Sequence, residues 1–518
     1  MFMRVVSVTS SPNTSNDETP SFKEVKAWFD KNMSTDAINF DDQRVYENVY
    51  HQATSRTPGV FQLTSQGAQR LFKNAKPRSI IDIATLTSVF RPGPLAAKVD
   101  KLYLESKADP KAIDYKHPLI KQVLEPTYGC IIFQEQLMSL CNIVAGFPKS
   151  ECDKVRKNIL KRTGGNPEES KKKALAMKQG FVDGSVKNGI RESVASKLWD
   201  DILYFAGYGF NLSHALAYAV DSYYCAWLLT YYESEWLCAY MESMIGNPDN
   251  RAEAISDVKK MGYEIGNVDI NISTNQWSVD ATRKILIPSF NTVKGVGETA
   301  IEEILACRPY KSIEEMLWKP DGHWRPSKFT RRSLDALIKS NAFESMNVVG
   351  EGKLFSSLKQ MHHVLIENSE AIKKWVMKDP LRGKNNFKEL LVETAGMPEW
   401  TRRELATAQV ETIGKFEPLS LIPPELKQKF ENREVASVDA WSKLDVYWFI
   451  VTDSVEKKTK NGKPYLLLQI VGESGTTLRM YLWDWDGRLS FAPYTLCVAE
   501  VDCSEFGMST KGKKIKIM

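Results

Sequence analysis

Two hydrophobic patterns divide the chain into a long helical part and a shorter part of strands. Between residues 95 and 245 apolar residues recur at helical spacing, and the run from Ser222 carries aliphatic and aromatic residues on most faces. Such a run is typical of a core helix, an interpretation we favour over a stacking surface for nucleic acid. From residue 441 the pattern alternates with period two, and Lys460-Asn461-Gly462-Lys463 is a hairpin signal. We therefore predict a multidomain, mainly α chain that ends in a small β-barrel.

Length and composition narrow the class of protein. The 518 residues suffice for about three or four domains. The formal net charge of +5 is small for this length, but the segment from Lys149 to Arg191 is rich in Lys and Arg. Eight cysteines without a CxxC pair argue against a zinc ribbon or a redox dithiol. No apolar run approaches the roughly 20 residues that cross a bilayer, so we expect no membrane association and a cytoplasmic protein.

The first 36 residues have their own character. A cluster of Ser, Thr, Asn and Pro between Thr9 and Thr19 predicts a flexible leader without a signal peptide. Apolar residues at helical spacing after Ser21 then predict one short docking helix.

Three stretches between Tyr128 and Ala219 carry the candidate chemistry. YGCIIFQEQLM (128–138) is a turn followed by a helical pattern, and DKVRKNILKR (153–162) is a helix with clustered cations. GYGFNLSHALAYA (207–219) is an aromatic, glycine-containing turn that enters a helix with hydrogen-bonding side chains near its start. A cationic face beside such a turn suits a ligand with phosphates and a flat base. Taken alone, a charged helix face is usually only solvated, and a lone His at a turn is more often structural.

In this order the three stretches resemble the fingers of the family C bacterial replicative DNA polymerases, the alpha subunit of DNA polymerase III. GVFQLTSQG from Gly59 and FRPGPL from Phe90 are similar to further blocks of that family. Leu212 stands where the family has a lysine, which removes one basic contact. The resemblance implies that the incoming nucleotide is bound by Gln134, Gln136, Arg156, Lys157, Lys161, Asn211, Ser213, His214 and Tyr218.

The resemblance continues beyond the fingers. GVG at 295–297 and RRSLDALIKSNAF at 331–343 are similar to the family's tandem helix-hairpin-helix, and the final strands to its OB-fold. This predicts fingers at 37–245, a helix-hairpin-helix region at 246–345, a helical connector at 346–440 and an OB-fold at 441–518. Tyr481, Trp483 and Trp485 could stack bases, although at period two they could equally face the core. The implied DNA-binding residues are Lys294, Gly295 and Gly297 in the hairpin and Lys458, Lys460 and Lys463 in the barrel.

The family's metal-binding aspartates have no counterpart in these residues. A family C polymerase holds two Mg²⁺ ions on three palm aspartates, and the sequence contains neither of their motifs. Asp41-Asp42 aligns instead with a pair that binds no metal. We therefore expect both ions and the palm on a separate N-terminal polymerase chain.

On this hypothesis the chain is the C-terminal half of a split DNA polymerase, inactive alone, that binds dNTP and template-primer DNA. The divided arrangement suggests a bacteriophage or prophage. A sliding clamp is a further candidate partner, although Gln428-Lys429-Phe430 is a poor copy of the clamp-binding peptide. The alternative is a non-catalytic DNA-binding accessory protein derived from such a polymerase.

Overall fold

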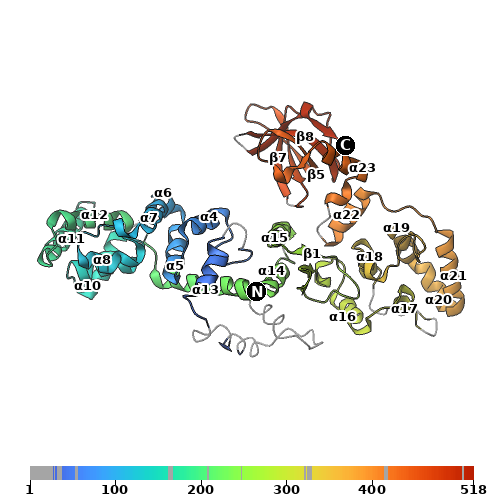
Figure 1. The fold of residues 1–518 in the computed structure, drawn as a ribbon, viewed down its shortest axis with the longest axis horizontal. Helices are drawn as coiled ribbons and strands as arrows, with labels where there is room; N and C mark the ends of the chain where they lie inside the picture. Colours follow the sequence, from blue (N-terminus) through green and yellow to red (C-terminus); the bar gives the residue numbers. More distant parts are fainter. Residues whose placement is uncertain are drawn as a thin grey trace. The chain divides into compact units, whose positions relative to one another are not determined.

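The computed structural model describes residues 38–52, 57–160, 167–206, 209–246, 248–319, 330–413, 418–475, 477–504 and 507–518, with a few isolated positions besides. The predicted leader and almost all of the docking helix lie outside these residues. The described chain forms two compact units that divide after Trp236 (Figure 1).

The first unit is helical. The run from Ser222 falls in α13, where Tyr223, Ala226 and Leu228 are buried, so the predicted core role is confirmed. A second core surrounds Phe181 and Trp199, whose rings lie 5.2 Å apart. The helices are α3 (Gln43–Val45), α4 (Gln66–Ala75), α5 (Ile80–Val89), α6 (Pro92–Ala96), α7 (Val99–Ala108), α8 (Pro118–Leu124), α9 (Gln134–Ser139), α10 (Lys149–Leu160), α11 (Pro167–Lys187), α12 (Glu192–Ala206) and α13 (Leu212–Tyr231), with π-helical turns at Tyr46–Tyr50 and Leu140–Val144.

Local sequence explains where these helices begin. Ser65 and Ser79 accept hydrogen bonds from the first turns of α4 and α5, and Pro92 occupies the first position of α6. Gly184 lets α11 pack closely against the end of the π-helical turn Leu140–Val144, because a Cβ at this position would lie 1.9 Å from the carbonyl oxygen of Ala145.

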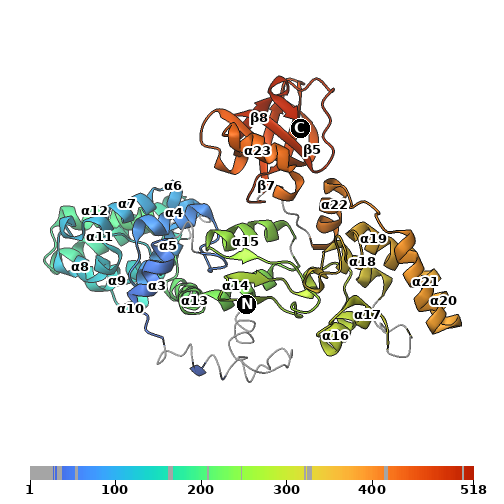
Figure 2. The same ribbon diagram turned by 45° about the vertical axis from the view of Figure 1, so that its right-hand side comes forward.

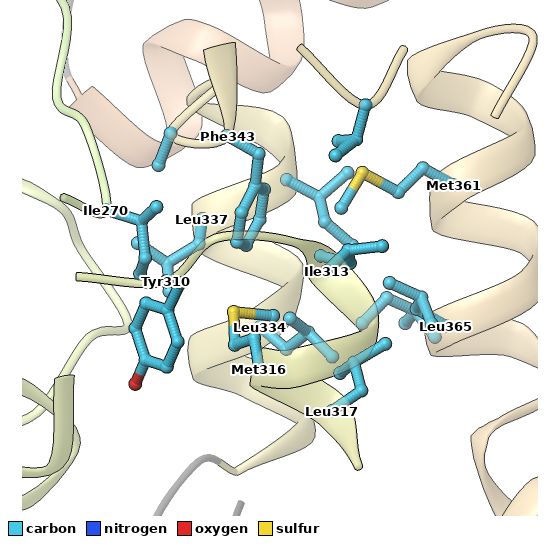
Figure 3. Packing of buried hydrophobic residues seen from close by; sticks show 14 of the residues in the cluster. Ile270, Tyr310, Ile313, Met316, Leu317, Leu334, Leu337, Phe343, Met361 and Leu365 are labelled. Carbon is cyan, nitrogen blue, oxygen red and sulfur yellow. The ribbon is translucent and has the colours of Figure 1, made fainter. Parts of the chain in front are cut away.

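The second unit begins within α14 (Glu233–Ser243) and continues with α15 (Pro248–Lys260) and a small sheet. Its strands β1 (Glu264–Ile265), β3 (Ile285–Ile287) and β2 (Ser278–Asp280) pair in that order. A helical core follows, in which Met316, Leu337, Phe343 and Met361 converge (Figure 3). Its helices are α16 (Glu298–Cys307), α17 (Ile313–Leu317), α18 (Arg331–Lys339), α19 (Leu358–His362), α20 (Ser369–Lys378), α21 (Pro380–Glu393) and α22 (Arg402–Ile413), with a π-helical turn at His363–Glu367.

The last strands close into a five-stranded barrel. The ring runs β5 (Asp445–Lys458), β6 (Pro464–Val471), β7 (Thr477–Trp483), β9 (Gly507–Lys511), β8 (Thr495–Ser504) and back to β5. Only the β7–β9 pair of this ring is parallel. Two short strands pair with this ring: β4 (Ala436–Ser437) pairs with β5, and β10 (Ile515–Ile517) pairs with β8. The strand order is that of an OB-fold, so the predicted fold class is confirmed.

Helices α22 and α23 (Pro424–Asn432) pack against this barrel. Phe430 of α23 is buried and lies 6.3 Å from Trp448 with nearly parallel rings. Since Phe430 belongs to this core, the poor clamp-peptide candidate at 428–430 has no free aromatic anchor. The exact domain boundaries drawn from the sequence remain predictions.

Candidate nucleotide and DNA interface

The structure joins two of the predicted nucleotide blocks through their backbones. The Gln134 N–H donates to the carbonyl oxygen of Phe210 at 2.8 Å, and the Phe210 N–H donates to that of Ile132 at 3.0 Å. Residues 76 positions apart therefore pair as neighbours at the start of α9 and α13.

Glu135 holds the first turn of α13. One carboxylate oxygen accepts the Asn211 side-chain amide at 2.9 Å, and the other accepts the Leu212 N–H at 2.8 Å. Asn211 in turn accepts the His214 N–H at 2.8 Å, as an N-cap residue does, and the Ser213 hydroxyl at 3.1 Å. The first N–H group of α13 is therefore satisfied by protein, and a ligand here would meet side chains rather than this group.

Arg156 reaches the same turn through one glutamine. Its Nη1 donates to Gln134 Oε1 at 3.1 Å, and Gln134 Nε2 donates to the Gly209 carbonyl oxygen at 3.0 Å. Gln134 thus links the cationic helix α10 to the turn before α13. Lys161 lies outside the described residues, so its implied contact with the nucleotide stays a prediction.

Asp153 moderates the charge of this cluster. It accepts Arg156 Nη2 at 2.8 Å and Lys157 Nζ at 2.6 Å. The hydrogen bonds from Lys157 and Arg156 lower the pKa of the Asp153 carboxyl. Two cations and one carboxylate leave a net single positive charge. Lys157 is 58% exposed and Arg156 21%, so both can reach a phosphate from this surface.

Aromatic rings continue the surface along α13. Arg91 lies over the Phe210 ring at 4.1 Å, and the His214 ring lies 5.4 Å from Phe210 and 4.1 Å from Tyr218. Phe61 is 5.1 Å from Tyr218 on the far side. Flat faces of this kind suit a nucleobase.

Three further residues of this surface, Arg91, Phe61 and Glu135, carry no site role predicted from the sequence. Arg91 and Phe61 belong to the FRPGPL and GVFQLTSQG blocks, which served only for recognition. A signal for Arg91 was therefore present in its position directly before Pro92-Gly93-Pro94, where it is the N-cap residue of α6.

Gln136 lies in a different environment from the one predicted. Its side chain is buried, its oxygen accepts the N–H groups of Ile132 and Phe133 at 2.9 and 3.0 Å, and its nitrogen donates to the Thr127 hydroxyl at 2.7 Å. These contacts assign it a structural role in the turn rather than the predicted contact with nucleotide.

The predicted hairpin of the second unit packs against α18. Gly295 has φ of +112°, and a Cβ there would lie 3.3 Å from that of Ala336, so this close approach needs glycine. The Ser333 hydroxyl donates to the Gly295 carbonyl oxygen at 3.2 Å. Gly297 precedes α16 with no side chain over the helix N-terminus, and Lys294 is exposed beside it. This arrangement presents N–H groups and a cation to a phosphate.

The barrel carries its predicted cations and an aromatic face. Lys458 ends β5, while Lys460 and Lys463 lie in the exposed loop before β6. The Trp483 ring lies 4.9 Å from Tyr465 and 5.4 Å from Tyr481, with an interplanar angle of 8° in the second pair. These three half-buried rings form what we call the barrel face.

Cations flank this face in register. Lys457 is paired with Tyr465, and Lys511 with Trp483. Leu466 and Leu482 point the other way, into the barrel core. Alternating cations and rings match the pattern that holds single strands.

Trp485 does not belong to the barrel face. Strand β7 ends at Trp483, and Asp484 has φ of +53°, which redirects the chain. The Trp485 ring then packs on the barrel core and donates its N–H to the Leu489 carbonyl oxygen at 2.9 Å. The period-two grouping of all three aromatics was therefore wrong for this one.

The acidic side chains offer no alternative metal site in the described chain. Asp42 caps α3 and accepts the Tyr231 hydroxyl at 2.6 Å. No group of three or more His, Cys, Asp or Glu side chains is placed to hold a metal ion among the residues that the structure describes. Within the same ranges, no helix has both the length and the apolar character to span a bilayer.

Comparison with known proteins agrees with the geometry. Residues 20–188 match the sequence model of the bacterial DNA polymerase III alpha subunit finger domain, and residues 262–350 match that of a helix-hairpin-helix motif. The predicted resemblance to the DNA polymerase III alpha subunit is confirmed.

Individual relatives define how far the likeness to the alpha subunit reaches. The DNA polymerase III subunit alpha of Campylobacter jejuni is 34% identical over 344 residues, which cover 65% of this chain and 27% of the relative. The Haemophilus influenzae subunit is 32% identical over 413 residues, or 77% of this chain and 34% of the relative. The Escherichia coli subunit is 33% identical over 315 residues, or 60% and 26%. The chain thus spans between a quarter and about a third of these relatives. A phage origin stays a prediction.

Proposed function

We propose that the chain supplies the fingers, helix-hairpin-helix and OB-fold of a DNA polymerase of the DNA polymerase III alpha type. In this role it binds the incoming dNTP and template-primer DNA for template-directed synthesis. The observation that carries the proposal is the convergence of Arg156, Arg91 and the turn before α13 on one surface, in a unit that matches the finger domain. A palm outside these 518 residues, on a separate chain, completes the active site.

Each part of this surface has a separate task. The exposed Lys157 and the forked guanidinium of Arg156 bind the triphosphate. The rings of His214 and Tyr218 lie along the nucleobase, and Gln134 keeps Arg156 directed at the turn. Charge-assisted hydrogen bonds contribute about 1.5–3 kcal/mol each, so two of them hold a nucleotide against competition from water.

The reaction itself depends on the palm. Two Mg²⁺ ions held by palm aspartates would supply the charge stabilisation for attack of the primer 3′-hydroxyl on the α-phosphate of the dNTP, in which the hydroxyl loses its proton and pyrophosphate leaves. This chain orients the triphosphate and holds the DNA through the hairpin at 294–297 and the barrel face. The Asp153 carboxylate already forms ion pairs with Arg156 and Lys157. A phosphate that binds these two cations must therefore displace Asp153 or share its contacts.

A second candidate function is a non-catalytic DNA-binding accessory protein. It is favoured by one observation, namely that the hairpin and the barrel face are complete without the Arg156 cluster. An accessory protein would bind DNA but would need neither Arg156 nor Lys157.

Primer extension separates the two functions. The chain is assayed alone and with a palm-bearing polypeptide of the same polymerase type, with Mg²⁺ and dNTPs. We expect extension only in the mixture, lost with Arg156→Ala plus Lys157→Ala and retained with the control Lys121→Ala, an exposed lysine of α8.

The other outcomes are equally informative. Extension by the chain alone would contradict the palm in trans. DNA binding without extension in any mixture would favour the accessory protein.

A further inference from the structure

The helical hairpin of α20 and α21 carries a concentration of positive charge that the proposed function does not use. The two helices pack side by side, as Figure 2 shows, and are joined at Asp379. Between residues 373 and 388 the chain has six basic residues and one acidic residue, a net charge equal to the +5 of the whole protein. We call this segment the basic hairpin tip; its cations are Lys373, Lys374, Lys378, Arg382, Lys384 and Lys388.

These cations are not neutralised within the described chain. Lys373 contacts Glu370 at 3.3 Å, and both side chains are at least half exposed, so this pair contributes little. For the other five cations, no ion pair is found among the residues that the structure describes. The single carboxylate of the segment, Asp379, is used as the N-cap of α21, where it accepts the Arg382 N–H at 3.1 Å.

The hairpin is built to hold this charge in a fixed place. Ile372 and Val376 of α20 and Phe387 and Leu391 of α21 face inward and belong to the helical core. Gly383 sits where the helices cross, and a Cβ there would lie 2.8 Å from the Val376 nitrogen. The closeness of the crossing limits relative movement of the two helices, so the cations form a preorganised surface.

Exposed apolar side chains accompany the cations. Met377 is 86% exposed and Leu381 71%, on either side of the joint at Asp379. Single exposed apolar residues are common on protein surfaces, but beside these cations they add apolar contact area for the sugars of a nucleic-acid backbone.

We propose that the basic hairpin tip binds the phosphate backbone of duplex DNA, as a contact separate from the hairpin at 294–297 and the barrel face. This inference rests on the proposed DNA-binding function and extends it to a segment that the sequence analysis had treated as a connector. Four lysines and one arginine on these two helices have no ion pair among the described residues. Such cations match a partner with regularly spaced negative charges that is bound without recognition of its base sequence.

The test is the salt dependence of duplex binding by the full chain. A fluorescent duplex is titrated with wild-type protein and with the triple variant Lys374→Gln, Lys378→Gln and Arg382→Gln. Each lost phosphate contact makes the negative slope of log K against log salt shallower by about 0.9. For the triple variant we therefore expect a slope shallower by about 2.7 and an affinity for the duplex at least roughly tenfold weaker near 0.1 M salt.

Two control variants are measured in the same way. The first control is a triple variant with the same charge change at exposed positions of α23 and its C-cap, namely Lys427→Gln, Lys429→Gln and Arg433→Gln. It should leave the slope within experimental error. Lys374→Arg with Lys378→Arg should retain the wild-type slope. Circular dichroism confirms that the helices are intact in all variants.

The failures are distinguishable. If the triple variant and the wild type bind with equal slopes, the tip does not contact DNA, and an acidic protein surface becomes the better partner. If the wild type itself binds no duplex, the proposed DNA-binding function fails together with this inference.

Discussion

Glu135 provides the sharpest test of how the nucleotide surface is assembled. Its carboxylate accepts the Leu212 N–H and the Asn211 amide from the other predicted block. Glu135→Ala removes two hydrogen bonds to a charged group, worth about 1.5–3 kcal/mol each, but Asn211 is exposed and recovers part of its share from water. We expect the first turn of α13 to lose about 2–3 kcal/mol of opening free energy, a factor of about 30–140.

Hydrogen exchange at the amides of Leu212 to Ala215 measures this local effect directly, which matters because a chain of two units need not unfold in one step. Glu135→Gln keeps one acceptor and should give about half the loss. Glu192→Ala, an exposed acidic residue in the first turn of α12, is the matched control and should change exchange little. Exchange at α13 that stays within about twofold of wild type in Glu135→Ala would refute the reasoning.

Three further predictions concern the core, the barrel face and the contact between Asp335 of α18 and His362 of α19. Asp82 is buried and accepts the largely buried Lys107 at 2.6 Å, so Asp82→Asn should lower the free energy of unfolding of the first unit by about 3–5 kcal/mol; an unchanged thermal transition would contradict this. Trp483→Ala and Tyr481→Ala should each weaken binding of a single-stranded oligonucleotide by about 1–3 kcal/mol in a fluorescence titration, and equal affinities would exclude stacking there. Burial raises the pKa of Asp335, but hydrogen bonds from His362 and a lysine outweigh it and hold that pKa below its ordinary value. Its stabilisation is therefore full above about pH 4 and lost as pH falls through the lower folded pKa, so Asp335→Asn should reduce the melting temperature at pH 7 more than at pH 3.

Local sequence signals were sufficient for the helical part and for the final barrel, but they did not indicate the small sheet of β1, β2 and β3. The helical period before residue 245, the alternation after residue 441 and the Asn461-Gly462 turn each depend on neighbouring residues alone. Gly295 could be placed in a tight hairpin for the same reason, since its positive φ is a local requirement.

The composition of the nucleotide surface needed tertiary structure. Gln134, Glu135 and Gln136 are consecutive polar residues of one helical pattern, so spacing alone does not distinguish their roles. The packing sends them to three different partners, namely Arg156, the start of α13 and the buried turn at Thr127. For Gln134 and Glu135 the partner comes from a segment 22 and 77 residues away in the sequence, and no local pattern encodes that.

The same distinction holds for the exposed surfaces. The residue types of the barrel strands and the charge of residues 373–388 can be read from the sequence alone. The outward direction of Tyr481 and Trp483 and the inward direction of Trp485 depend on the fold, because Asp484, with a left-handed backbone, follows the end of β7. The tertiary structure also decided that the lysines of α20 and α21 stand on one rigid hairpin, since the close crossing at Gly383 is a contact between two helices and not a property of either.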